Sequence, residues 1–279
     1  MVEHSPHNSK VVGHHFLPWG KFLDLKLRDK VIVVTGASRG IGRGIAELLA
    51  AEGAVLVLAA RSREQLEEVA TACGSETLIV ATDLREMDAP QKLIETAVTR
   101  FGRIDVLVNN AGATKRGDFL ELTEAEWHDG FALKFFGAMR CCRAAWIHLQ
   151  ASCGSIVNIV GVGGRTGNAE FAIGGSVNAA LLNLTKVLAD RGTHDGIRVN
   201  AINPGAIATE RLQIRIKAFA SEHGLDINKA AQRMAQKLGV ARFGEPDEIA
   251  RVVAFLASTA ASYCHGSIID VDGGETRTL

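Results

Sequence analysis

The sequence contains few aromatic residues and no excess of charge of either sign. Phe, Trp and Tyr make up 5% of its 279 residues, and Tyr263 is the sole tyrosine. Lys and Arg together number 31, as do Asp and Glu, so no long-range field favours nucleic acid or an anionic membrane. No uninterrupted run of roughly eighteen apolar residues occurs, which argues against a membrane span. We therefore expect neither a nucleic-acid partner nor a membrane partner.

Cysteine is also scarce, and its spacing does not suit a metal site. The five cysteines include an adjacent pair, Cys141 and Cys142. On a helix these two side chains would point about 100° apart, which makes them poor joint ligands. We expect free thiols in a reducing, cytoplasmic setting and no bound metal.

Residues 1–27 form an N-terminal extension with its own composition. Four histidines and two prolines fall in its first eighteen residues: His4, Pro6, His7, His14, His15 and Pro18. It has no basic region followed by an apolar stretch and a cleavage site, so it does not resemble a secretory signal. We expect a poorly ordered extension, or an arm that packs on a neighbouring subunit.

The rest of the chain, 28–279, alternates short apolar strands with helices. Strands are expected at 31–35, 55–60, 78–82, 104–109, 155–160, 197–202 and 267–270. Helices are expected at 40–52, 63–72, 90–101, 124–149, 175–191 and 246–258. This order predicts an α/β fold: a single doubly wound Rossmann domain with a parallel seven-stranded sheet and helices on both faces. The hydrophobic content of 47%, mostly Ala, Val, Leu and Ile, is typical of such buried strands.

One segment, 209–240, interrupts this alternation. It reads as two amphipathic helices, Arg211–Ala220 and Asn228–Leu238, placed between a Pro-Gly loop and the last helix. Ligands of open α/β sheets bind outside the carboxyl ends of the strands, and a helical insertion there is a natural lid. The segment is therefore predicted to cover a small-molecule substrate.

The first strand leads directly into a glycine-rich turn, Thr35-Gly-Ala-Ser-Arg-Gly-Ile-Gly42. Gly36 would allow a sharp turn, Gly40 would let the backbone approach a pyrophosphate, and Gly42 would permit close helix–strand packing. The helix that follows would present its positive N-terminal end to the phosphates. A strand–glycine turn–helix order is typical of dinucleotide binding.

Several further motifs make the resemblance to a known family clear. They are Asn109-Asn-Ala-Gly112, Asn203-Pro-Gly-Ala-Ile-Ala-Thr209, Asp83 after the third strand, and Asp270-Val-Asp-Gly-Gly274. With the glycine turn, these motifs resemble the short-chain dehydrogenase/reductase family over residues 28–274. The resemblance implies an NAD(P)-dependent oxidoreductase that acts on a carbonyl or alcohol substrate. It also implies a homo-oligomer, a tetramer or a dimer, that packs through its long central helices and C-terminal strand.

The resemblance implies cofactor contacts at matched positions. Asp83 and Leu84 would border the adenine, and Asn110, Ala111 and Gly112 would line the adenosine side. Pro204, Gly205, Ile207 and Thr209 would hold the nicotinamide half. The cofactor set is completed by residues of the glycine turn and of the second strand end: Gly36, Ser38, Arg39, Gly40, Ile41, Gly42 and Arg61.

The second strand ends in a way that favours NADP(H) over NAD(H). An acidic residue there would bind the ribose 2′-hydroxyl and repel a 2′-phosphate. The sequence reads Leu58-Ala-Ala-Arg-Ser-Arg63, so Ala60 stands where that acid would fall. Arg61 follows it, and Arg39 lies in the glycine turn. Two guanidinium groups make a suitable clamp for one phosphate.

All four positions of the family's Asn-Ser-Tyr-Lys catalytic set are substituted in this chain. In the family, Tyr transfers the substrate proton, Lys lowers its pKa and holds the ribose, Ser fixes the carbonyl, and Asn completes a proton relay. The Ser, Tyr and Lys positions match Gly161, Gly174 and Asn178. No shift of register recovers a tyrosine, because residues 150–190 contain none.

The fourth position, that of the relay Asn, is occupied by Lys134. It falls on the apolar stripe Trp127, Phe131, Ala138 and Cys141 of the helix expected at 124–149. A lysine on such a face either extends to water or is held in a polar pocket. If it reaches the volume left by the family's Lys, a depressed pKa would make it a proton donor. We take Lys134 and Asn178 as the candidate catalytic residues.

Four other polar residues accompany Gly174 and could contact a substrate or simply be solvated: Arg165, Asn168, Glu170 and Ser176. Three functions are compatible with the sequence. One is an NADP(H)-dependent oxidoreductase with a non-standard proton donor. The second is a catalytically inactive nucleotide-binding homologue that acts as a sensor or partner subunit. The third is a non-redox lyase or isomerase that reuses the pocket.

Overall fold

Seven short apolar strands form one parallel sheet in the order β3-β2-β1-β4-β5-β6-β7. The computed structural model describes residues 24–277, so residues 1–23 of the expected N-terminal extension lie outside the described residues. The strands are β1 (Val31–Thr35), β2 (Val55–Ala60), β3 (Thr77–Ala81), β4 (Val106–Asn109), β5 (Ser155–Ile159), β6 (Arg198–Pro204) and β7 (Ile268–Val271). The predicted parallel seven-stranded sheet is confirmed.

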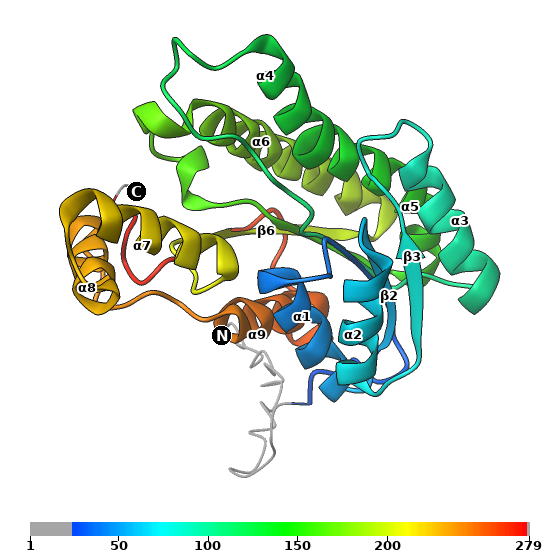
Figure 1. Ribbon diagram of the computed structural model, residues 1–279. Coiled ribbons are helices and arrows are strands. Elements are labelled where there is room, and N and C mark those ends of the chain that lie inside the picture. The colour runs from blue at the N-terminus through cyan, green and yellow to red at the C-terminus, as the bar shows by residue number, and fades with distance from the viewer. Residues whose placement is uncertain (1–23, 278–279) are drawn as a thin grey trace, which may run out of the picture.

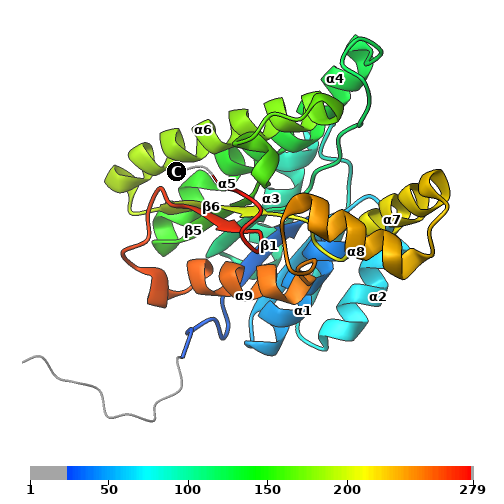
Figure 2. The same cartoon turned by 90° about the vertical axis from the view of Figure 1, so that its left-hand side faces the viewer.

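Helices cover both faces of this sheet (Figures 1 and 2). On one face lie α1 (Gly40–Ala51), α2 (Arg63–Cys73) and α9 (Pro246–Ala257). On the other lie α3 (Ala89–Phe101), α4 (Glu124–Phe131), α5 (Ala138–Ser152) and α6 (Ala172–Asp195). The strand order reverses between β1 and β4, and this switch opens a crevice at the carboxyl ends of the strands.

The central strands are buried on both faces, and alternate residues serve the two cores. Ile32 and Val34 of β1 pack with α1 and α9, whereas Val31 and Val33 pack with α3 and α5. All four side chains are at most 4% exposed. Leu27 also belongs to the first of these cores, so the packed structure begins upstream of residue 28.

The helix expected at 124–149 is not continuous. It consists of α4, a π-helical turn at Ala132–Gly137, and α5. A π-helical turn inserts one residue into the helical repeat and is frequent at functional sites. Lys134 lies inside this turn. The apolar residues of α4 and those of α5 therefore do not form the single continuous stripe that the sequence predicts.

The long helix α6 begins three residues before the expected start and ends four residues after the expected end. Together with the preceding turn, Ala169–Asp195 is long and apolar enough to cross a membrane by length and composition alone, with a mean hydropathy of 1.3. The segment is still not an uninterrupted apolar run, because Asn178, Asn183 and Lys186 fall within it, and its Ile, Val, Leu and Ala residues raise the average. In the fold, Ile173, Val177 and Leu181 of this helix are buried, as in a core helix.

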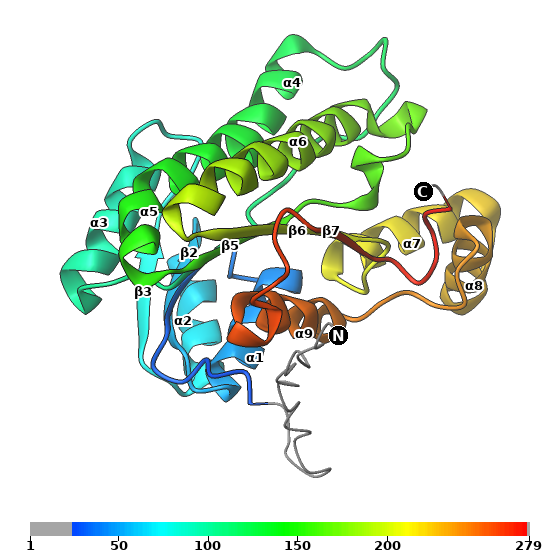
Figure 3. The ribbon, with the colours of Figure 1, turned by 180° about the vertical axis from the view of Figure 1, so that it is seen from behind.

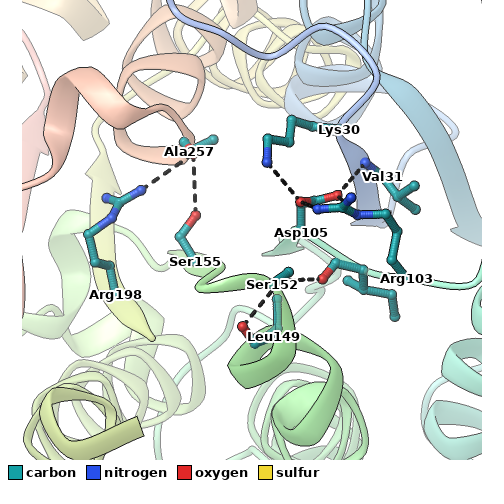
Figure 4. A network of polar contacts seen from close by, with 10 residues as sticks. Lys30, Val31, Arg103, Asp105, Leu149, Ser152, Ser155, Arg198 and Ala257 are labelled. Atoms are coloured by element: carbon teal, nitrogen blue, oxygen red, sulfur yellow. Dashed lines mark hydrogen bonds and ion pairs between the residues drawn. The ribbon is translucent and has the colours of Figure 1, made fainter. Parts of the chain in front are cut away.

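At the amino ends of the strands, a buried carboxylate joins two neighbouring strands (Figure 4). Asp105, which is 3% exposed and precedes β4, accepts a hydrogen bond from the backbone N–H of Val31 at 3.0 Å. It also accepts from Lys30 Nζ at 3.0 Å and from Arg103 Nε at 2.9 Å. This network lies at the amino ends of the strands, whereas the glycine-rich turn lies at their carboxyl ends. It holds the first residues of β1 and β4 next to each other.

The predicted lid is a helical hairpin outside the sheet. It comprises α7 (Glu210–His223) and α8 (Ile227–Leu238), which pack on each other through a small core that includes Leu212, Ile216 and Met234. Figure 3 shows this hairpin beyond β6 and β7, beside the C-terminal segment. The hairpin therefore lies on the carboxyl side of the sheet, where a lid is predicted, and its role as a lid stays a prediction.

Candidate functional site

The glycine-rich loop between β1 and α1 has no room for side chains at two positions. Gly36 has a φ of +66°, and a Cβ on it would lie 2.8 Å from the Cα of Ala111. A Cβ on Gly42 would lie 2.1 Å from the carbonyl oxygen of Gly36. The first turn of α1 therefore packs directly against the loop, and the surface at the start of this helix is lined by backbone.

Thr35 and Asn110 tie this loop to the end of β4. The Thr35 hydroxyl oxygen accepts from the backbone N–H groups of Asn110 at 3.0 Å and of Ala111 at 3.1 Å. The Asn110 side chain donates from Nδ2 to the carbonyl oxygens of Thr35 and Gly36, both at 3.0 Å. Asn110 thus supports the loop with its side chain, a role that its motif did not reveal. Thr35 was not among the predicted site residues.

The residues expected around the adenine lie at the ends of β2 and β3. Ala60 ends β2, and the side chain of Arg61 is exposed just beyond it. The Asp83 carboxylate accepts from Arg85 Nη1 at 3.2 Å, while Leu84 is buried. Ala60 therefore ends β2 where an acid would bind a ribose 2′-hydroxyl, and the exposed side chain of Arg61 follows it.

The start of the lid reaches both walls of the crevice. Arg39 of the glycine loop forms an ion pair with Glu210, with Nη1 and Oε2 3.2 Å apart. Arg211, the next residue, donates from Nη2 to the carbonyl oxygen of Gly112 at 3.1 Å. The remaining predicted cofactor residues lie on the same side of the sheet: Ser38, Gly40 and Ile41 at the start of α1, Pro204 at the end of β6, and Gly205, Ile207 and Thr209 before the lid.

Lys134 is directed into the site and does not extend to bulk water. Its stem passes over Gly112, whose Cβ, if present, would lie 2.9 Å from Lys134 Cδ. Its Nζ donates to the carbonyl oxygen of Val160 at 2.5 Å, one residue before Gly161. Loss of solvent around the ammonium, with added repulsion from Arg211, lowers the pKa of Lys134 to about 7.

The backbone at Gly161 has a conformation that other residues rarely adopt. Its φ is +130°, and a Cβ there would lie 3.1 Å from Asn178 Nδ2. Asn178 is 3% exposed, and its Nδ2 donates to the Gly161 carbonyl oxygen at 3.4 Å. Its buried Oδ1 has no hydrogen-bond partner among residues 24–277. The site therefore contains a free, buried acceptor next to Gly161.

An aromatic ring fills the volume beside Gly174. A Cβ on this residue would lie 2.0 Å from Cζ of Phe171, and a Cβ on Gly163 would lie 2.8 Å from Cε1 of the same ring. The guanidinium carbon of Arg116 lies 4.3 Å from the centre of this ring. The chain's sole tyrosine, Tyr263, is fully exposed and precedes β7, on the amino side of the strands, whereas the site lies at their carboxyl ends. No tyrosine therefore reaches the site.

Sequence reasoning missed Phe171 and Arg116, because neither belongs to a motif. It also missed a polar chain in which Asn203 accepts from the Gly161 N–H at 3.2 Å and donates to Asp270 at 2.8 Å. Asp270 in turn lies 3.5 Å from Arg165 Nε. The positions of Asn203 and Asp270 at two adjacent strand ends were the available signal.

The other predicted polar residues lie near one another on the surface. The Asn168 side chain accepts from the Glu170 N–H and caps a short turn, and Ser176 is exposed. The Glu170 carbonyl oxygen accepts from the Gly117 N–H at 3.1 Å, which joins the loop after β5 to the loop after β4. An open cavity of about 430 Å³ lies between these two loops.

A dinucleotide cofactor suits the residues around the glycine loop. A side chain at Gly36 or Gly42 would collide with backbone, so these glycines allow the sharp turn and the close packing of α1 that a dinucleotide-binding loop requires. The first-turn N–H groups of α1 receive no side-chain cap from Arg39 and are suited to an anion. The unpartnered Asn178 Oδ1 is a ready acceptor for a ligand hydroxyl. These features fit the cofactor that the sequence predicts.

Comparison with known proteins agrees with this geometry. Residues 36–276 match the family described as Enoyl-(Acyl carrier protein) reductase. The meso-2,3-butanediol dehydrogenase of Serratia marcescens is 32% identical over 255 residues, which cover 91% of this chain and 97% of that protein. The 3-oxoacyl-[acyl-carrier-protein] reductase of Synechocystis sp. is 35% identical over 254 residues, which cover 89% of this chain and 97% of that protein.

Among solved structures, the L-sorbose reductase of Gluconobacter frateurii, complexed with NADPH and L-sorbose, superposes with a TM-score of 0.89. It is 34% identical and covers 92% of this chain and 100% of that chain. The fold and the cofactor crevice define a Rossmann-type nucleotide-binding domain. The chain belongs to the short-chain dehydrogenase/reductase family of NAD(P)-dependent oxidoreductases.

Proposed function

We propose that this protein is an NADP(H)-dependent oxidoreductase that interconverts a carbonyl compound and its alcohol, with Lys134 as the proton donor. The observation that carries the proposal is the position of the Lys134 ammonium, which is 2.5 Å from the Val160 carbonyl oxygen, one residue before Gly161. When bound, the nicotinamide cofactor supplies or accepts the hydride. Reduction of a carbonyl also consumes a proton, and Lys134 is a titratable group placed to supply it.

The proposal includes substitution of the whole family catalytic set. Gly161 and Gly174 then stand where Ser and Tyr would be, and Asn178 stands where Lys would be. The buried, unpartnered Oδ1 of Asn178 supports a role in holding a ribose hydroxyl of the cofactor. Lys134 takes over the proton transfer, and the chain Gly161–Asn203–Asp270 positions the backbone beside it.

The pKa of Lys134 suits this role. A general acid works best when its pKa is near the working pH, and desolvation brings the pKa of Lys134 from 10.5 to about 7. At neutral pH both forms are populated, so the ammonium can protonate the alkoxide formed on reduction. The neutral amine can accept the alcohol proton in the reverse direction.

Charge at the end of β2 supports the preference for NADP(H). Arg61 is exposed beside Ala60, and Arg39 lies across the glycine loop. No carboxylate follows β2 at the position where one would repel a 2′-phosphate. The 2′-phosphate would compete with Glu210 for Arg39, while the diphosphate would lie at the start of α1.

The test compares Lys134→Met with wild type in binding and in single-turnover hydride transfer. NADPH and NADH affinities are measured first, then NADPH oxidation over a panel of ketones and aldehydes. We expect NADPH to bind more tightly than NADH, and Lys134→Met to slow hydride transfer by about 10²–10⁴-fold with NADPH affinity nearly unchanged. Lys115→Met, an exposed lysine near the same crevice, is the matched control and should keep the wild-type rate.

Two outcomes would overturn the proposal. NADPH binding without turnover on any carbonyl or alcohol would identify a nucleotide-binding homologue without catalysis. A Lys134→Met variant that keeps the wild-type rate would show that the proton comes from water or from the substrate.

A further inference from the structure

Two arginines on different elements have no carboxylate partner within ion-pair distance among residues 24–277. Arg116 comes from the loop after β4, and Arg215 comes from the lid helix α7. The hydrogen bond from Arg211 Nη2 to the Gly112 carbonyl oxygen, 3.1 Å long, holds α7 against the loop that carries Arg116. Desolvation lowers the pKa of Arg116, and the positive charge of Arg215 adds to this effect. Two guanidinium groups that form no ion pair keep their N–H donors available for an anion.

The orientation of Arg116 is set by Phe171. Its guanidinium carbon lies 4.3 Å from the centre of the Phe171 ring, which itself is enclosed by Gly163 and Gly174. A guanidinium over an aromatic face keeps its N–H donors available, because they lie in its own plane. The ring that fills the volume beside Gly174 therefore also supports a cationic donor at the edge of the crevice.

The lid places Arg215 on the same side as Arg211. The two residues are four apart in α7, so they lie on one helix face, and Arg211 reaches the carbonyl oxygen of Gly112. That face is therefore turned toward the crevice. Like charges at this spacing are mutually unfavourable, which an anionic ligand between the lid and the loop would relieve.

Two acidic side chains, Glu170 and Glu275, act on Arg116 through their charge. Glu275 is held apart by its hydrogen bond from the Ala206 N–H to Oε2 at 3.2 Å. Desolvation raises the pKa of Glu275, and both Arg116 and Arg215 counteract this rise without forming an ion pair with it. The negative charge of Glu275 therefore acts on the two arginines without direct contact, and neither guanidinium forms an ion pair with it.

We propose that Arg116 and Arg215 form a carboxylate-binding subsite, so that the substrate of this enzyme is an oxo acid or the corresponding hydroxy acid. The inference rests on the proposed function, since it names the substrate class of that reaction. Bound between the lid and the loop, the carboxylate would leave the carbonyl carbon on the side of Lys134 and of the nicotinamide. Closure of the lid would then be coupled to recognition of the acid.

The test has one arm that does not depend on turnover. Thermal denaturation of the NADPH-saturated protein is measured with a series of straight-chain oxo acids, their amides and phosphate monoesters of matched size. The acids should raise the melting temperature more than the amides. Arg116→Gln and Arg215→Gln should each weaken acid binding about 10- to 100-fold, and Arg233→Gln on α8 should leave it unchanged.

The second arm measures kcat/KM for each acid and its amide. The wild-type preference for the acid should be about 10- to 100-fold and should fall toward one in Arg116→Gln and in Arg215→Gln. Acid binding without turnover would support the subsite and contradict the proposed reaction. Turnover without preference for the acid, or a phosphate monoester bound more tightly than the oxo acid, would overturn the carboxylate subsite and leave the reaction in place.

Discussion

Lys134 is the residue on which the proposed chemistry depends. Its pKa is lowered by two causes that can be tested separately. Desolvation is the larger cause of its lowered pKa, and the positive charge of Arg211 is the smaller one. Below pH 7 the ammonium predominates, so the rate of carbonyl reduction should fall as pH rises through about 7, and alcohol oxidation should fall as pH decreases through the same value.

Arg211→Gln removes one of these influences and should raise the pKa of Lys134. Both pH profiles should therefore move to higher pH, whatever the change in absolute rate. The measurement is the pH dependence of single-turnover hydride transfer at saturating NADPH. Lys217→Gln, an exposed substitution on the same helix, should leave the midpoint in place. If the midpoint does not change in Arg211→Gln, the titrating group is not Lys134.

Phe171 explains why Gly174 cannot simply be replaced by a tyrosine. A Cβ on Gly174 would lie 2.0 Å from its ring, so Gly174→Tyr requires the ring to leave. We expect Gly174→Tyr to lower the free energy of unfolding by about 1–3 kcal/mol or more through overpacking. In Phe171→Ala/Gly174→Tyr the two changes should be strongly non-additive, since the new side chain takes the vacated volume. Urea denaturation of the four proteins measures this coupling, and simple additivity would contradict it.

Among the elements, the strands were the most predictable and the long central helix was the least. The strands are buried on both faces, so each is a short apolar run bounded by turns, and all seven expected ranges overlap the observed strands. The helix expected at 124–149 keeps its apolar spacing through Ala132–Gly137, and this spacing cannot reveal a π-helical turn. That turn is what carries Lys134 over Gly112.

The site was predictable where it depends on backbone and unpredictable where it depends on packing. The structural roles of Gly36 and Gly42 could be predicted, because a Cβ at either position would collide with nearby backbone. Phe171 and Arg116 could not, since the ring acquires its place only through contact with Gly174 and the guanidinium only through contact with the ring. No residue spacing encodes such contacts.

The joint between β1 and β4 supports a prediction on stability. The Asp105 side chain is 3% exposed. Asp105→Ala would remove the acceptor of the Val31 N–H and the carboxylate that pairs with Lys30 and Arg103. We expect the free energy of unfolding to fall by about 2–3 kcal/mol, measured by urea denaturation. Asp88→Asn, in an exposed pair with Lys92, should change it by less than about 0.5 kcal/mol. Equal effects of the two substitutions would contradict the role assigned to Asp105.

For the whole molecule, the apolar residues that remain on the outer helices bear on assembly. Phe136, Ile147 and Val187 are 40%, 68% and 56% exposed and lie on the elements that cover one face of the sheet. Large exposed apolar side chains on adjacent elements mark an interaction surface. They support the predicted homo-oligomer, a dimer or tetramer formed through the long central helices, in which identical faces of two subunits would meet.

Acidic substitutions on this face should therefore dissociate the oligomer into smaller species. Sedimentation velocity over a range of protein concentrations is expected to show a dimer or tetramer for wild type. Ile147→Glu/Val187→Glu is expected to shift it to smaller species, because burying unpaired carboxylates at the interface is unfavourable. Ile214→Glu on the lid, where the native side chain is 63% exposed, provides a matched control that should sediment as wild type. A wild-type protein that stays monomeric at every concentration, or a double variant that keeps its assembly, would assign these apolar side chains to the solvent-exposed surface of a monomer or to a different contact.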